Sequence, residues 1–181
     1  RKKPPGTLLA SAHAVDREFR VMKALANTDV PVPDMIALCT DESVIGSAFY
    51  IMSFAKGRVF MDPTLPGLSN TERALIYAEL RRVAAAIHSL RPSDVGLADF
   101  GRPEGYLKRQ IERWSKQYRA SETEHIASME QLMHWLPAHL PESESTGLVH
   151  GDFRIDNVIF HPTEPRAIAV IDWELSTLGD P

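Results

Sequence analysis

The feature that most constrains this 181-residue chain is a run of polar residues near its C-terminal end. The run is His150-Gly151-Asp152-Phe153-Arg154-Ile155-Asp156-Asn157, and Ile171-Asp172-Trp173-Glu174 follows it. The apolar residues 158–160 and 167–171 between them predict the two strands of one hairpin. Because a hairpin returns the chain to the side from which it left, we expect Asp152, Asn157 and Asp172 to converge on one cleft.

The spacing of these three oxygen-bearing side chains suits phosphoryl transfer. That reaction needs a carboxylate beside the acceptor hydroxyl and oxygen ligands that hold Mg²⁺ on the phosphates of ATP. Protein kinases use the same five-residue separation between the Asp and the Asn of their catalytic loop. Asp and Asn are also common in loops simply because they form turns. The hypothesis therefore depends on the loop and Asp172 together.

The pattern His-Gly-Asp-x-x-x-x-Asn followed by Ile-Asp-Trp-Glu resembles the aminoglycoside phosphotransferase and choline kinase family. The resemblance implies that Asp152 is the catalytic base and that Asn157 and Asp172 bind magnesium. It also implies that His150 is structural and braces the loop. Glu174 lies two residues beyond Asp172, where it could approach a second metal ion or the substrate, and its role stays open.

The resemblance implies an α+β, protein kinase-like fold of two lobes. A partial nucleotide-binding lobe is expected over residues 1–56 and an incomplete helical catalytic lobe over residues 57–181. The spacing of apolar residues predicts these elements in the first lobe: a helix over 14–25 and strands over 36–39 and 49–54. In the second lobe it predicts a long helix that begins at a Ser69–Glu72 capping box, and helices over 104–119 and 123–135.

A kinase small lobe grips the ATP phosphates with a basic residue that pairs with a glutamate on a helix. Similarity to the family makes Glu18 the candidate glutamate, although a solvated helix glutamate would explain the same residue. The basic partner is expected to be Arg1, Lys2 or Lys3, on a strand that Pro4 ends. We favour Arg1, whose planar guanidinium would replace the usual lysine.

The segment over residues 49–55 resembles the strand and hinge whose backbone meets adenine, which implicates Met52 and Phe54. An ordinary buried strand explains the same residues. The family's Gly-rich phosphate loop would lie upstream of Arg1, so we expect this chain to be an internal part of a longer polypeptide.

Longer stretches resemble the branch of the family that is found beside, or fused to, acyl-CoA dehydrogenases. They are residues 1–6, 14–20, 57–60, 116–123 and 173–181. This resemblance implies phosphorylation of a hydroxyl on a hydroxyacyl-CoA, which converts that hydroxyl into a better leaving group. An aminoglycoside or choline-type kinase is the nearest alternative. An antibiotic substrate would favour an acidic acceptor pocket, whereas the helices expected to line this pocket carry as many bases as acids. A metal-dependent phosphohydrolase built on Asp152 and Asp172, and a non-catalytic kinase-like binding module, stay open as well.

The composition of the chain bears on its binding partners and on the compartment in which it is expected. The net charge is −4 and the isoelectric point is about 6.0, which does not favour nucleic acid as a partner. No apolar run approaches the roughly 20 residues that span a bilayer, and the single cysteine, Cys39, is typical of a reducing compartment, so we expect a cytoplasmic protein. Trp114, Tyr118 and Trp135 fall at helical spacings, which favours packing over base-stacking as their role.

Overall fold

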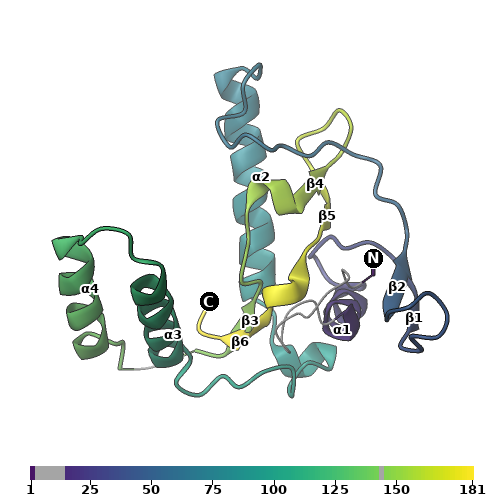
Figure 1. The fold of residues 1–181 in the computed structure, drawn as a ribbon. Helices are drawn as coiled ribbons and strands as arrows, with labels where there is room; N and C mark the ends of the chain where they lie inside the picture. The colour runs from purple at the N-terminus through teal and green to yellow at the C-terminus, as the bar shows by residue number, and fades with distance from the viewer. Residues whose placement is uncertain (3–14, 143–144) are drawn as a thin grey trace.

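The computed structural model describes residues 1–2, 15–142 and 145–181 and has a mixed α and β architecture (Figure 1). Its helices are α1 (Val15–Leu25), α2 (Asn70–His88), α3 (Tyr106–Ser121) and α4 (Ala127–Ala138), with short 3₁₀ turns η1 (Pro92–Val95), η2 (Ile155–Asn157) and η3 (Trp173–Leu175). Its strands are β1 (Met35–Cys39), β2 (Phe49–Met52), β3 (Gly147–Val149), β4 (Val158–Phe160), β5 (Ala167–Val170) and β6 (Thr177–Gly179). Within the described residues the strands form three antiparallel pairs, β1–β2, β3–β6 and β4–β5.

Helix α1 and the β1–β2 hairpin form one packed unit. The helix buries Val21, Met22 and Leu25 completely, and it contacts β1, β2 and η3. Lys2 pairs with Phe49 in an isolated antiparallel bridge, as expected if a strand runs there. The expected end of that strand at Pro4, and Lys3, lie outside the described residues.

Helix α2 begins where the sequence predicts, because both hydrogen bonds of the Ser69–Glu72 capping box form. One face of the helix buries Ile76, Val83 and Ile87 against β3 and β5. Burying each such side chain contributes about 1.5–3 kcal/mol relative to leaving it in water. The helix therefore supports β3, which leads into the His150–Asn157 loop, and β5, which leads to Asp172 (Figure 1).

The hairpin of β4 and β5 confirms the turn that the sequence predicts between Asn157 and Asp172. Gly57 and Arg58 join its edge: Arg58 forms an antiparallel bridge with Phe160, and a Cβ at Gly57 would lie 2.2 Å from the Phe160 carbonyl oxygen. The pairing of β3 with β6 was not predicted, because a three-residue strand over 177–179 has no periodicity of its own. The lobe boundary near residue 57 stays a prediction.

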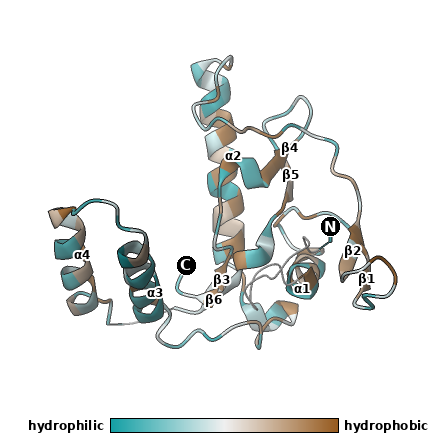
Figure 2. Cartoon of the chain, viewed as in Figure 1, coloured by the Kyte–Doolittle hydropathy of each residue, from teal (hydrophilic) through white to brown (hydrophobic). Residues whose placement is uncertain are grey.

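Helices α3 and α4 stand to one side of the rest of the chain (Figure 1). Neither helix contains a buried residue, and α3 is largely hydrophilic (Figure 2). Trp114 and Trp135, for which the sequence favours a packing role, are 56 % and 53 % exposed, so they pack at the surface of the helix pair and not in a core. The two helices pack mainly against each other, so regular spacing of aromatic residues creates no core here.

Helix α4 extends to Ala138, beyond residue 135 where the predicted helix ends, and it includes Pro137. Proline is tolerated there because it lies in the last turn, where it removes one hydrogen bond and interrupts nothing further. Among the described helices, none combines the length and the apolar character that crossing a membrane requires.

Candidate active site

The loop between β3 and η2 holds Asp152 beside Asn157. The Asn157 side-chain amide donates to the Asp152 backbone carbonyl at 2.9 Å and to Asp152 Oδ2 at 3.1 Å. Because both contacts use the amide nitrogen, the Asn157 side-chain oxygen faces away from Asp152. An amide oxygen held in this way is a ligand of the hard type that Mg²⁺ prefers.

Asp172 is tied to that loop through the residue before it. The Ile171 N–H donates to the Asn157 carbonyl at 2.9 Å, so the end of β5 is fixed to the end of η2. Asp172 itself adopts a left-handed conformation, with φ 65°. A non-glycine residue in that region costs on the order of 1–3 kcal/mol and is common at functional sites. The structure thus brings Asp152, Asn157 and Asp172 to one region, as the sequence predicts.

His150 contacts both the loop that holds Asp152 and the segment that leads to Asp172. It is 2 % exposed; its Nε2 is 3.1 Å from the Ile171 carbonyl, and the Asp152 N–H donates to its Nδ1 at 3.3 Å. These partners require the neutral ring with its proton on Nε2. Burial lowers the pKa of His150 below the ordinary 6.5, which favours that form. Its ring also lies against the buried Trp173, with centroids 4.4 Å apart.

Gly151 explains why this loop differs from the His-Arg-Asp of protein kinases. Its φ is +87°, and a Cβ there would lie 2.5 Å from the Leu175 carbonyl oxygen. Both the backbone conformation and the contact with η3 therefore require glycine. The sequence indicates a special position here, because glycine replaces the arginine of protein kinases. It does not indicate the reason, because Leu175, whose backbone leaves no room for a side chain, is 24 residues away.

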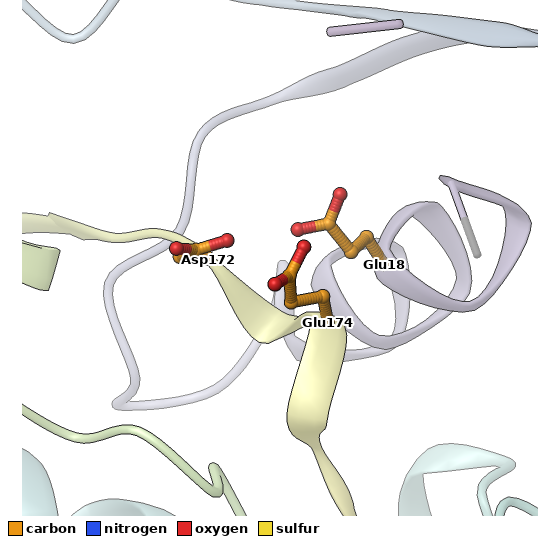
Figure 3. A group of neighbouring side chains, drawn as sticks. All are labelled: Glu18, Asp172 and Glu174. Carbon is orange, nitrogen blue, oxygen red and sulfur yellow. The ribbon is translucent and has the colours of Figure 1, made fainter. Parts of the chain in front are cut away.

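A second cluster joins α1 to the Asp172 turn. Glu18, Asp172 and Glu174 point toward one another, and their carboxylate oxygens lie within 4.8 Å (Figure 3). The Arg1 guanidinium contacts all three: Nη1 is 2.7 Å from Glu18 and 2.5 Å from Asp172, and Nη2 is 2.7 Å from Glu174. The expected pair of Arg1 with Glu18 is thus present, and it extends to Asp172.

Glu18 is the fully buried carboxylate of this cluster. Its pKa is raised to about 7, mainly by burial and also by the charges of Asp172 and Glu174, whereas the charge of Arg1 opposes the rise. Tyr50 donates its hydroxyl to Glu18 Oε2 at 3.2 Å, a contact that sequence reasoning missed. Within the described residues Arg1 contacts all three carboxylates, and carboxylate oxygens such as those of Asp172 are ligands of the type that a divalent cation prefers.

Met52 and Phe54 belong to the segment implicated in adenine binding. Met52 is the last residue of β2 and is half-buried. Phe54 follows β2 and is 89 % exposed, so it is not part of the core. Sequence reasoning also missed Arg154, whose Nε lies 3.6 Å from Asp152 Oδ1 and which also pairs with Asp156.

Comparison with known proteins places this arrangement in a family. The model of the phosphotransferase enzyme family, APH, matches residues 1–181. Mouse acyl-CoA dehydrogenase family member 10 is 55 % identical over the whole chain, which spans 17 % of that protein. A Ralstonia eutropha structure provisionally described as an aminoglycoside phosphotransferase is 60 % identical, with a TM-score of 0.87 over 93 % of this chain and 52 % of that one.

The chain belongs to the APH phosphotransferase family. Its protein kinase-like fold is also that of the streptomycin–ATP–APH(2″)-IIa ternary complex, with a TM-score of 0.61 at 20 % identity over 92 % of this chain and 56 % of that one. The expected resemblance to both the family and its acyl-CoA dehydrogenase branch is thereby confirmed. The chain is a small part of the mouse relative, so the activity of a whole protein of that kind remains a matter of proposal.

Gly151→Ala is expected to destabilise the protein by more than Gly46→Ala. Both glycines have positive φ, +87° and +82°, but a Cβ at Gly46 meets nothing within 4 Å. The control should cost about 1 kcal/mol from backbone strain alone, whereas the loop variant adds a clash with the Leu175 backbone. Urea unfolding measures the difference, and equal losses would show that the close approach to Leu175 is unimportant.

The stability conferred by His150 is expected to fall with decreasing pH. Because burial holds its folded pKa below 6.5, the unfolded chain binds a proton first as the pH drops through 6.5. The free energy of unfolding should then fall by up to about 1.4 kcal/mol per pH unit from this group. Unfolding of the protein and of His150→Asn between pH 5 and 8 tests this, since the variant should lose that part of the slope. An unchanged slope would contradict the neutral buried ring.

Proposed function

We propose that this chain is the catalytic part of a kinase that transfers the γ-phosphate of ATP to a hydroxyl of a small molecule. The observation that supports it is the joining of Asp152, Asn157 and Asp172 by hydrogen bonds through Ile171. Membership of the APH family and a kinase-like fold agree with it. A protein that only bound nucleotide would not need a carboxylate held in this position.

In the proposed reaction Asp152 accepts the proton of the acceptor hydroxyl as its oxygen attacks the γ-phosphorus. The bond between that phosphorus and the oxygen of the departing ADP breaks, and the phosphate ester forms. The Asn157 amide keeps the Asp152 carboxylate oriented for this step. The His150 ring fixes the Asp152 backbone from the other side.

The Asn157 side-chain oxygen and the Asp172 carboxylate are the residues proposed to hold Mg²⁺, and their oxygen chemistry fits that ion. When bound, Mg²⁺ neutralises charge on the phosphates. Arg1 is proposed to contact the same phosphates, and Glu18 to position it through their 2.7 Å contact. Glu174 also contacts Arg1, so we propose that it orients the guanidinium. Met52 and Phe54 stay the candidates for the adenine-binding edge.

The proposed acceptor is a hydroxyacyl-CoA. The support is the name of the mouse relative, an acyl-CoA dehydrogenase family member, whose sequence aligns with the whole of this chain. Phosphorylation converts a hydroxyl into a good leaving group, which prepares it for elimination before a dehydrogenase acts on the acyl chain. An aminoglycoside is a less suitable acceptor, because it is a polycation and arginines line the cavity beside Gly151.

Asp152→Asn in the complete protein should keep its affinity for nucleotide and lose phosphoryl transfer by roughly 10²–10⁴-fold, the usual contribution of a positioned base. Asp94→Asn, an exposed aspartate on η1, is the matched control and should be unchanged. The assay follows ADP formation with and without a hydroxyacyl-CoA. Unchanged turnover in Asp152→Asn would remove its catalytic role, and phosphate release that needs no alcohol would favour a phosphohydrolase.

Asp172→Ala should weaken the binding of magnesium–ATP at least tenfold while the binding of ATP without a divalent ion changes little. The reason is that the substitution removes a metal ligand and also frees Arg1 from one of its three carboxylates. Calorimetric titration in Mg²⁺ and in EDTA measures the two affinities. An unaltered affinity for magnesium–ATP would contradict the metal assignment.

A further inference from the structure

A cavity of about 610 Å³ opens between the first turns of α3 and the turn after Asp172. Gly151 and Leu175 form one wall, so the cavity begins one residue from Asp152. Arg102, Arg109, Arg113 and Trp114 lie on the α3 side. A volume of this size is within the range of small-molecule sites.

The cavity is basic. Among the residues that the structure describes, its lining includes three arginines and no acidic residue. None of these arginines forms an ion pair with a carboxylate within the described parts of the chain. This arrangement was hidden in the sequence, where the segment over residues 104–135 balances its bases and acids. Folding places the positive charges on the side of α3 that faces the catalytic loop.

The three guanidinium groups are not equivalent. Arg109 donates to the backbone carbonyls of Glu104 and Arg102, so it is held at the start of α3. The Arg113 guanidinium lies 5.7 Å from the centre of the Trp114 ring, and Arg102 is exposed. The charges of Arg109 and Arg113 also oppose the rise that burial causes in the pKa of Tyr106, which lines the same cavity.

We propose that this cavity binds the anionic, phosphate-bearing part of the acceptor, with Arg102 and Arg113 as its specificity-determining contacts. The proposal rests on the proposed function and names the substrate charge that its acceptor site selects. Guanidinium forks match phosphate geometry in a bidentate manner. The exposed ring of Trp114 offers a stacking surface for a heterocycle attached to those phosphates.

The same charges disfavour a polycationic acceptor. An aminoglycoside carries several ammonium groups, and it would meet three guanidinium groups, with no carboxylate among the described residues of the cavity wall to neutralise its charge. A coenzyme A thioester instead brings a diphosphate, a ribose phosphate and an adenine at the end of a long flexible arm. Its phosphates would bind at α3 while the arm passes Gly151 and carries the acyl hydroxyl to Asp152.

The test measures binding to the complete protein by calorimetry, with the nucleotide site filled by Mg²⁺ and a non-hydrolysable ATP analogue. The probes are coenzyme A, 3′-dephospho-coenzyme A, pantetheine and kanamycin. The test variant is Arg102→Gln/Arg113→Gln, which keeps Arg109 and its backbone hydrogen bonds. The control is Arg81→Gln, an exposed arginine of α2 that does not line the cavity.

The double variant is expected to weaken binding of coenzyme A at least tenfold and to make its salt dependence shallower. The control and the affinity for the ATP analogue should not change. Dephospho-coenzyme A should bind less tightly than coenzyme A, and pantetheine weakly in every variant. Binding of coenzyme A that occurs without the ATP analogue and is lost once the analogue fills the nucleotide site would show that its phosphates occupy that site instead, and this would overturn the proposal.

Two further outcomes would also overturn it: equal affinity of the double variant and the unaltered protein for coenzyme A, or binding of kanamycin as tight as that of coenzyme A. Because these readouts need no turnover, they are separate from the test of Asp152. Loss of transfer in Asp152→Asn together with unaltered coenzyme A binding in the double variant would leave the kinase proposal standing and remove only the basic acceptor site.

Discussion

The organisation of this site depends on the backbone of Ile171. Its N–H donates to Asn157 and its carbonyl faces His150 Nε2, so one residue fastens the end of β5 to both ends of the His150–Asn157 loop. The left-handed turn at Asp172 follows directly. Trp173, the next residue, is fully buried and donates its indole N–H to the Val170 carbonyl at 3.0 Å. This burial and hydrogen bond offset the conformational cost of the turn.

Electrostatics divides the region into two parts with opposite character. On the α1 side, three carboxylates contact Arg1 and supply oxygen atoms of the type that a divalent cation prefers. On the α3 side, three arginines line a cavity whose described wall contains no acidic residue. The Gly151–Leu175 contact separates the two, and Asp152 lies beside it. A nucleotide on one side and an anionic acceptor on the other would place a hydroxyl and a γ-phosphate on either side of the proposed base.

The fold supports the site through few elements. Helix α2 buries its apolar face against β3 and β5, and α1 contacts η3, so both flanks of the Asp172 turn rest on helices. Helices α3 and α4 differ, because they bury no side chain and contact mainly each other. The position of α3 governs the shape of the proposed acceptor cavity, whereas the loop, Asp172 and Arg1 depend on the packed part of the chain.

The sequence by itself determined the elements whose signals are local. The Ser69–Glu72 capping box, the apolar stripe of α2 and the hairpin between Asn157 and Asp172 follow from spacing along the chain, because helices and hairpins are stabilised by near neighbours. The family motif likewise identified the residues that meet at the site. The tertiary structure alone decided the contacts between distant segments: the β3–β6 pair, the Tyr50–Glu18 hydrogen bond and the gathering of arginines beside Gly151. These contacts join residues with no sequence periodicity in common, so only the folded backbone can bring them together.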